Sequence, residues 1–124
     1  MACACSCGND TTTKLIYACS GAANTGYLAD GVARKLNRDG SGNMTCLAAM
    51  GADLSGFIES AKEADKNIVI DGCPVSCGKK IFEAKGIPYT HFITTDFGVE
   101  KKKTEITPEV IDRVAGEICT AMNA

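Results

Sequence analysis

Residues 67–74 decide the fold and read Asn67-Ile68-Val69-Ile70-Asp71-Gly72-Cys73-Pro74. Three β-branched residues in succession favour a strand that is buried on both faces, because such strands show little alternation of polar and apolar side chains. Asp71-Gly72 ends the run. Pro74 is suited to the first position of a helix, where its missing N–H group is not needed. The stretch therefore predicts a strand, a turn and the start of a helix.

Similar units precede this stretch. Residues 15–18 form a short apolar run that stops at Ser20-Gly21, and apolar residues recur at helical spacing from about 25 to 37. A second apolar run over 44–50 ends at Gly51 and is interpreted as a strand. A helix is expected after it, capped by Asp53 or Ser55. The predicted buried face of that helix consists of Leu54, Phe57, Ile58, Ala61 and Ala64.

The pattern continues to the end of the chain. The third helix carries Ile81 and Phe82 and closes at Gly86, and a fourth run covers 89–95. Thr107-Pro108-Glu109 opens a last helix with an apolar stripe. Four βα units predict an α/β domain of the three-layer, doubly wound type: a mainly parallel sheet of about four strands with helices on both faces. We expect this domain to span 14–124 and residues 1–13 to form a flexible, Cys-containing tail.

Composition excludes several classes of partner. The chain has 124 residues and a formal charge of −2, so it has no basic field and we expect neither nucleic acid nor a membrane as a partner. No apolar run reaches the roughly 18 residues of a membrane-spanning helix. The opening residues, MACACSCGND, lack the basic and apolar regions of a secretory signal. We therefore expect a cytoplasmic protein with reduced thiols.

The chain has eight cysteines, and four of them fall where predicted strands end. Cys19 follows the first strand, Cys46 lies in the second run, Cys73 follows the third strand, and Cys77 comes one helical turn later. Parallel strands end at one edge of a sheet, where ligands bind. The i, i+4 spacing of Cys73 and Cys77 places both on one side of the predicted helix start. These cysteines are therefore predicted to converge.

The residues alone leave several interpretations open. Thiolates bind zinc or an iron–sulfur cluster, and they also attack electrophiles. Cys46 can equally fill core space, and packing is favoured for Cys119 in the last helix. Cys3, Cys5 and Cys7 form a cluster of soft ligands that suits Cu(I), or they are incidental tail sequence.

Other motifs carry less weight. The segment after Cys19 lacks the arginine of a CxxxxxR phosphatase loop and does not match a nucleotide P-loop. His91 has no evident acid beside it in the sequence and is interpreted as a strand histidine rather than a catalytic base. Lys101-Lys102-Lys103 is interpreted as a solvated loop, whereas Lys79 and Lys80 are candidates for offsetting thiolate charge.

Six segments together resemble the DGC-domain family of bacterial and archaeal proteins, which are proposed to bind zinc. The segments are Tyr17-Ala18-Cys19-Ser20-Gly21, Asn24-Thr25-Gly26-Tyr27-Leu28-Ala29-Asp30, Met44-Thr45-Cys46-Leu47-Ala48-Ala49-Met50-Gly51, Asp53-Leu54-Ser55-Gly56-Phe57, Ile70-Asp71-Gly72-Cys73-Pro74-Val75-Ser76-Cys77 and Thr95-Asp96-Phe97-Gly98-Val99. The resemblance covers roughly residues 14–114. It implies that Cys19, Cys46, Cys73 and Cys77 are the family's zinc ligands, and it assigns no reaction.

Three hypotheses follow. The leading one is a metal-binding protein that holds one zinc through Cys19, Cys46, Cys73 and Cys77. The second is an enzyme of thiol redox chemistry or persulfide transfer that uses Cys73 or Cys77 as nucleophile. The third is an iron–sulfur protein with the same four ligands. The sequence does not distinguish a structural, a catalytic and a carrier role for the metal, and it identifies no protein partner.

Overall fold

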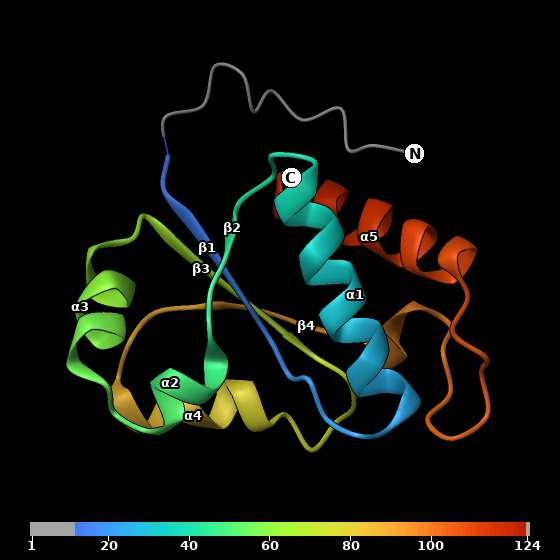
Figure 1. Ribbon diagram of the computed structural model, residues 1–124, viewed down its shortest axis with the longest axis horizontal. Helices are drawn as coiled ribbons and strands as arrows, with labels where there is room; N and C mark the ends of the chain where they lie inside the picture. Colours follow the sequence, from blue (N-terminus) through green and yellow to red (C-terminus); the bar gives the residue numbers. More distant parts are fainter. Residues whose placement is uncertain (1–11, 124) are drawn as a thin grey trace.

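The computed structural model describes residues 12–123, and its centre is one parallel sheet (Figure 1). The strands are β1 (Lys14–Ala18), β2 (Asn43–Met44), β3 (Lys66–Asp71) and β4 (Thr90–Ile93). They lie in the order β2-β1-β3-β4, and every neighbouring pair is parallel. The predicted α/β class and the parallel sheet of four strands are therefore confirmed.

Helices connect the strands. They are α1 (Asn24–Arg38), α2 (Leu47–Gly51), α3 (Ser55–Glu63), α4 (Cys77–Lys85), the short 3-10 helix η1 (Thr94–Phe97) and α5 (Pro108–Met122). The predicted ends of two helices are confirmed: α4 closes at Gly86 in the left-handed conformation, and the Thr107 side chain caps α5 by accepting from the Val110 N–H group. None of the helices in residues 12–123 is long and apolar enough to cross a membrane.

The core is divided between two clusters of buried side chains. In the first, Ile16, Ile68 and Ile70 pack with the apolar stripes of α1 and α5. In the second, Tyr17 and Val69 pack with residues of α2, α3 and α4, including Phe82. Successive side chains of a strand point to opposite faces, so the two clusters lie on opposite sides of the sheet. Figure 1 shows α1 and α5 grouped apart from α2, α3 and α4.

The interpretation of residues 44–50 as a strand is wrong. β2 contains only Asn43 and Met44, and one further backbone hydrogen bond joins Thr45 N–H to the carbonyl of Ile16 at 2.9 Å. Cys46 then stands at the N-cap of α2, whose Ala48 and Ala49 are strong helix formers. The edge strand is therefore short, and the chain leaves the sheet at Cys46.

The predicted cap and buried face of α3 are also partly wrong. Leu54 occupies the N-cap, while Asp53 adopts a positive φ and pairs with Lys85 instead of capping the helix. Leu54 and Phe57 are exposed, and only Ala61 is buried within α3. Because the Leu54 N–H group bonds back to the carbonyl of Ala49, the start of α3 is fixed by α2 rather than by a side-chain cap.

Pro74 does not begin the third helix. Residues 73–76 form a turn in which the Ser76 N–H group donates to the carbonyl of Cys73 at 3.0 Å, and Ser76 has a φ of 57°. Proline is favoured at the second position of such a turn because its φ is already set. α4 begins at Cys77, so Cys73 and Cys77 do not share a helix face.

Candidate functional site

The four predicted cysteines lie on loops and helix starts at the edge where the strands end. Cys19 directly follows β1, Cys46 comes shortly after β2, Cys73 lies in the turn after β3, and Cys77 is the first residue of α4. Cys19 and Cys73 are half-buried, whereas Cys46 and Cys77 are exposed. Cys119 differs from them because it is fully buried in the core, as predicted. The tail cysteines Cys3, Cys5 and Cys7 lie outside the described residues.

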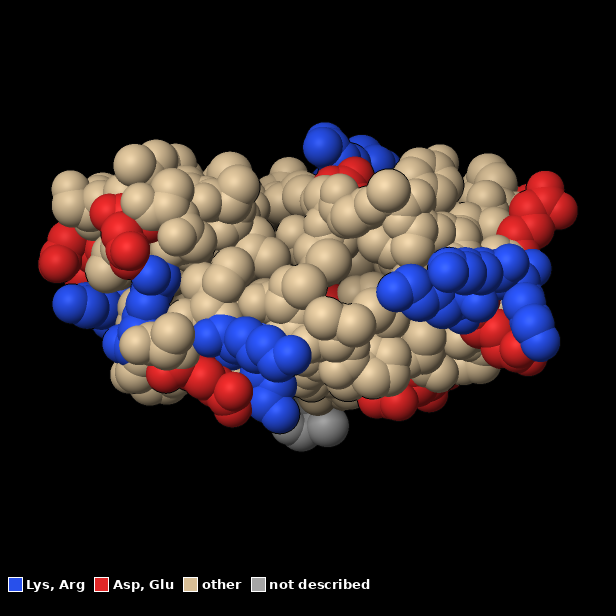
Figure 2. All heavy atoms as spheres, turned by 90° about the horizontal axis from the view of Figure 1, so that it is seen from below, with Lys and Arg blue, Asp and Glu red and all other residues tan. Residues whose placement is uncertain are grey.

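This edge is mostly uncharged at its centre. Figure 2 views the molecule from below, the side on which β1 and β3 end, and shows an uncharged middle with groups of Lys and Arg to either side. The charged side chains of this face, Asp and Glu as well as Lys and Arg, therefore lie mainly around its margin.

Backbone contacts hold two loops of this edge against the start of α1. A Cβ atom on Gly72 would lie 2.6 Å from the carbonyl carbon of Thr25, and one on Gly26 would lie 2.7 Å from backbone atoms of Gly21. Such distances exclude a larger residue unless the backbone moves. The loops that carry Cys19 and Cys73 are thus packed against the first turn of α1.

The half-buried Cys19 thiol is influenced by its surroundings. Burial raises the pKa of its thiol, and backbone hydrogen bonds from Gly21 and Gly72 partly offset that rise. The charges of Asp71 and Cys77 raise the pKa further. The surroundings of Cys19 therefore favour the protonated form of its thiol.

Cys73 contacts a lysine from the loop before α5. Lys101 Nζ lies 3.5 Å from the Cys73 sulfur. Asn24 fixes that loop: its amide nitrogen donates to the carbonyls of Glu100 and Thr104 at 3.1 and 2.8 Å, and its amide oxygen accepts from the Lys102 N–H group at 2.7 Å. All three lysines of this run are exposed, as predicted, and Lys101 in addition contacts the Cys73 sulfur.

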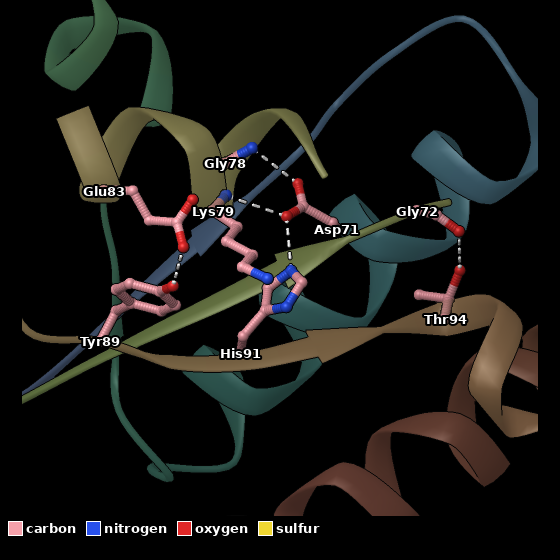
Figure 3. A network of polar contacts seen from close by, with 8 residues as sticks. All are labelled: Asp71, Gly72, Gly78, Lys79, Glu83, Tyr89, His91 and Thr94. Carbon is pink, nitrogen blue, oxygen red and sulfur yellow. Dashed lines mark hydrogen bonds and ion pairs between the residues drawn. The ribbon is translucent and has the colours of Figure 1, made fainter. Parts of the chain in front are cut away.

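A buried carboxylate organises the start of α4 (Figure 3). Asp71 is 1% exposed and accepts hydrogen bonds from the N–H groups of Gly78 at 2.8 Å and Lys79 at 3.1 Å. His91 Nε2 lies 2.7 Å from the same carboxylate. Thr94 holds the adjacent turn by donating to the carbonyl of Gly72 at 2.7 Å. Asp71 thus satisfies helix N–H groups that would otherwise lack a partner.

Sequence reasoning missed the pairing of Asp71 with His91. The two strands are parallel neighbours and Val69 is aligned with His91, so Asp71 lies two residues further along β3 on the same face. The pairing of Asp71 with His91 follows from the register of β3 and β4, and that register can be predicted only once the order of the strands is known. With an acid beside it, His91 is a satisfied strand histidine.

A cavity of about 1070 Å³ opens beside β1 and β2. Two of the predicted cysteines, Cys19 and Cys46, line it. The other lining residues come from the outer side of α1 and from β2, α2, α3 and α4, and they include Arg34, Arg38, Met44 and Phe57. The cavity therefore combines thiols, cations and an apolar wall, a mixture typical of small-molecule sites.

The structure brings the predicted ligands to one edge without gathering them into one coordination sphere. Cys19 and Cys46 share the cavity, Cys77 begins α4, and Cys73 contacts Lys101. Among residues 12–123, no group of three or more His, Cys, Asp or Glu side chains is arranged to hold a metal ion. The described geometry is thus a set of separate, at least partly accessible thiols along one edge.

Comparisons with known proteins agree with the pattern of motifs. A family model described as the DGC domain matches residues 15–118. The chain is 31% identical over 97 residues to the "Anaerobic and virulence modulator AnvM" of Pseudomonas aeruginosa, an alignment that covers 77% of this chain and 74% of that protein. No solved structure matches the chain.

Proposed function

The chain belongs to the DGC domain family, and from this premise we propose that it is a cytoplasmic zinc-binding protein with Cys19, Cys46, Cys73 and Cys77 as ligands. One observation supports the proposal most directly: all four thiols stand at the same edge of the sheet and remain at least partly accessible. Cysteine is among the residue types most often buried, so packing does not account for four accessible thiols in one place.

The donors fit zinc in kind. Thiolates are preferred ligands of structural zinc sites, and a site of four thiolates carries net negative charge that nearby cations offset. Lys101 beside Cys73 and the arginines of the cavity supply such cations. Because the described residues hold no preassembled group of donors, we propose that the ion draws the four cysteine-bearing segments together, a coupling of metal binding to local ordering.

Metal analysis of the native chain tests this proposal. After anaerobic purification, we expect one zinc per chain by elemental analysis, no visible absorption, and protection of four thiols from alkylation. Cys73→Ser should abolish stoichiometric zinc, because it removes one ligand from the set. The matched control replaces Cys3, Cys5 and Cys7 with Ser, which should leave the zinc content unchanged. If the control loses its zinc and Cys73→Ser keeps it, the metal site is in the tail and the proposal is wrong.

Two other outcomes identify the alternatives. A brown preparation with broad visible absorption indicates an iron–sulfur cluster on the same ligands. A metal-free chain in which Cys73 and Cys77 alkylate rapidly indicates thiol redox chemistry or persulfide transfer. The contact between Lys101 and Cys73 favours that second candidate, because the ammonium group places a positive charge 3.5 Å from the sulfur, where it attracts an anionic electrophile. Lys101→Gln should then slow alkylation of Cys73 and leave that of Cys77 unchanged.

A further inference from the structure

The cavity beside β2 is a consequence of how short that strand is. β2 ends at Met44, and after one more backbone hydrogen bond at Thr45 the chain turns into α2. Within residues 12–123, the end of β1 therefore has no neighbouring strand on that side. Ala18 and Cys19 line the cavity there, together with Cys46 where the chain leaves the sheet.

One cation in this cavity is available to a ligand. Arg34 is paired with Asp30 at 2.7 Å, and Asp30 also accepts from the Ser20 hydroxyl at 3.0 Å. Asn37 is occupied as well, because its side-chain oxygen accepts from the Met44 N–H group at 2.7 Å. Arg38 is exposed and has no side-chain partner among residues 12–123. Its guanidinium group is suited to a carboxylate, which it can bind through two parallel hydrogen bonds.

The opposite wall is apolar. Phe57, at the start of α3, is a large apolar side chain that leaves 38% of its surface exposed. Met44 and Leu47 are half-buried and also line the cavity. A ligand here can place methylene groups against these side chains while its anionic end reaches Arg38.

The two thiols of the cavity indicate which chemical group the ligand carries. Cys46 is exposed and Cys19 half-buried, so Cys46 is the thiol that a ligand meets first. A protein thiolate forms bonds with the sulfur atoms of disulfides, and exchange of this kind needs no other reactant. We propose that this cavity binds the disulfides of small thiols that carry a carboxylate. Arg38 binds the carboxylate, and the Cys46 sulfur exchanges with a sulfur atom of the ligand.

The exchange balances without a further reagent. The Cys46 thiolate attacks one sulfur of the bound disulfide, a new bond forms between Cys46 and that sulfur, and the ligand's own S–S bond breaks. The other half of the ligand leaves as a thiolate and takes a proton from water. Cys46 is oxidised to a mixed disulfide and half of the ligand is reduced to a thiol. This inference goes beyond zinc binding and does not depend on it.

The experiment compares two disulfide probes on the reduced full-length chain with a chelator present. Glutathione disulfide carries carboxylates, and bis(2-hydroxyethyl) disulfide is neutral. Rates of adduct formation are read at Cys46 and at Cys77 by peptide mass spectrometry. Cys77 is an internal control because it is also exposed but does not line the cavity. We expect the preference for the anionic probe to be greater at Cys46 than at Cys77.

Variants of Arg38 make the test specific. Arg38→Gln should slow the reaction of Cys46 with glutathione disulfide about tenfold, the size of one charge-assisted hydrogen bond, and leave the neutral probe unaffected. Arg38→Lys should restore most of the rate. Lys62→Gln, which removes an exposed cation outside the cavity, should change neither rate. Circular dichroism confirms that each variant is folded.

Several results would overturn the inference. One is that Arg38→Gln slows the reaction of Cys46 with both probes equally. Another is that Cys46 and Cys77 prefer glutathione disulfide over the neutral probe by the same factor. Because the chelator removes metal from every sample, these rates stay interpretable whether or not the chain binds zinc. A chain that lacks zinc but shows the predicted Cys46 preference disproves the proposed function and supports this inference.

Discussion

At the scale of single residues, the cysteine edge depends on glycines that allow backbones to touch. Gly72 is the sharpest case, because an added Cβ would meet the backbone of Thr25 at 2.6 Å, where no flexible side chain can move away. We predict that Gly72→Ala destabilises the fold by about 1–3 kcal/mol, the usual range for overpacking. Urea denaturation followed by circular dichroism measures the change.

Gly116 provides the matched control for that substitution. It lies inside α5, and an added Cβ there meets nothing within 4 Å. Gly116→Ala should therefore stabilise the chain by roughly 0.5–1 kcal/mol through helix propensity. Equal stability of the Gly72→Ala variant and the wild type would contradict this prediction. It would show that the loop at Gly72 can move away from the start of α1 without loss of unfolding free energy.

Tyr17 makes stability depend on pH at the alkaline end. The side chain is 1% exposed, its hydroxyl donates to the Asn67 side-chain oxygen at 2.8 Å, and burial raises its pKa from 10.0 to about 12. Below pH 10 the phenol is protonated in both states and its full contribution is present. Between pH 10 and 12 only the unfolded chain loses the proton, so stability falls by about 1.4 kcal/mol per pH unit.

The measurement is the difference in unfolding free energy between wild type and Tyr17→Phe across this pH range. Taking the difference cancels the contributions to the unfolding free energy of other groups that titrate near pH 10 in both proteins. The wild type should lose roughly 2 kcal/mol relative to the variant by pH 12. Parallel curves for the two proteins would mean that the phenol ionises as readily in the folded chain as in the unfolded one.

At the scale of elements, the start of α4 depends on a side chain from the strand before it. The Asp71 carboxylate accepts from the Gly78 and Lys79 N–H groups while buried. In Asp71→Asn the amide nitrogen cannot accept, so one buried N–H group loses its partner. We predict a loss of about 1–3 kcal/mol in the free energy of unfolding and faster hydrogen exchange of the Gly78 and Lys79 amides.

Asp65→Asn is the control for this element. Asp65 also accepts from a backbone N–H group, that of Thr13 at 2.7 Å, but it is exposed. Water can replace the lost bond there, so the change should stay within about 0.5 kcal/mol. If Asp71→Asn and Asp65→Asn lose the same free energy of unfolding, burial does not determine the strength of the Asp71 contact.

The elements that were predictable are those whose local pattern and tertiary packing agree. α1 and α5 have buried apolar stripes at helical spacing, and β3 has a β-branched run that is buried on both faces. The errors lie where tertiary contacts override local signals. Pro74 is compatible with either a turn or a helix start, and the capping of α4 by Asp71 decides between them. Phe57 fits the apolar spacing of α3, yet its side chain lies along the cavity.

The candidate site was predictable in its location and not in its internal geometry. The positions of Cys19 and Cys73 after strands follow from the βα order, because parallel strands end at one edge. The contact between Lys101 and Cys73 joins residues 28 apart in the sequence. It depends on how Asn24 holds the loop before α5, and no local pattern encodes such a contact. The zinc ligand set stays a prediction.

At the scale of the whole molecule, one sheet carries two separate cores. Ile16 and Ile68 face the cluster of α1 and α5, whereas Tyr17 and Val69 face the cluster of α2, α3 and α4. Each strand therefore contributes side chains to both clusters through the same backbone. Losing one cluster would expose one face of β1 and β3, which is unfavourable because those strands are apolar on both sides. The two faces should therefore unfold together.

Two core truncations test this coupling. Phe82→Ala removes a buried ring from one cluster, and Ile118→Ala shortens a buried side chain in the other; both residues are 0% exposed. We predict losses of about 3–5 kcal/mol for Phe82→Ala and about 2–5 kcal/mol for Ile118→Ala. Urea unfolding of each variant is followed by tyrosine fluorescence, which includes Tyr17 and Tyr89 of the Phe82 cluster, and by far-ultraviolet circular dichroism. The two signals should share one midpoint in each variant. In Ile118→Ala, loss of helical signal before tyrosine signal would show that the faces unfold independently and that the sheet does not transmit stability between them.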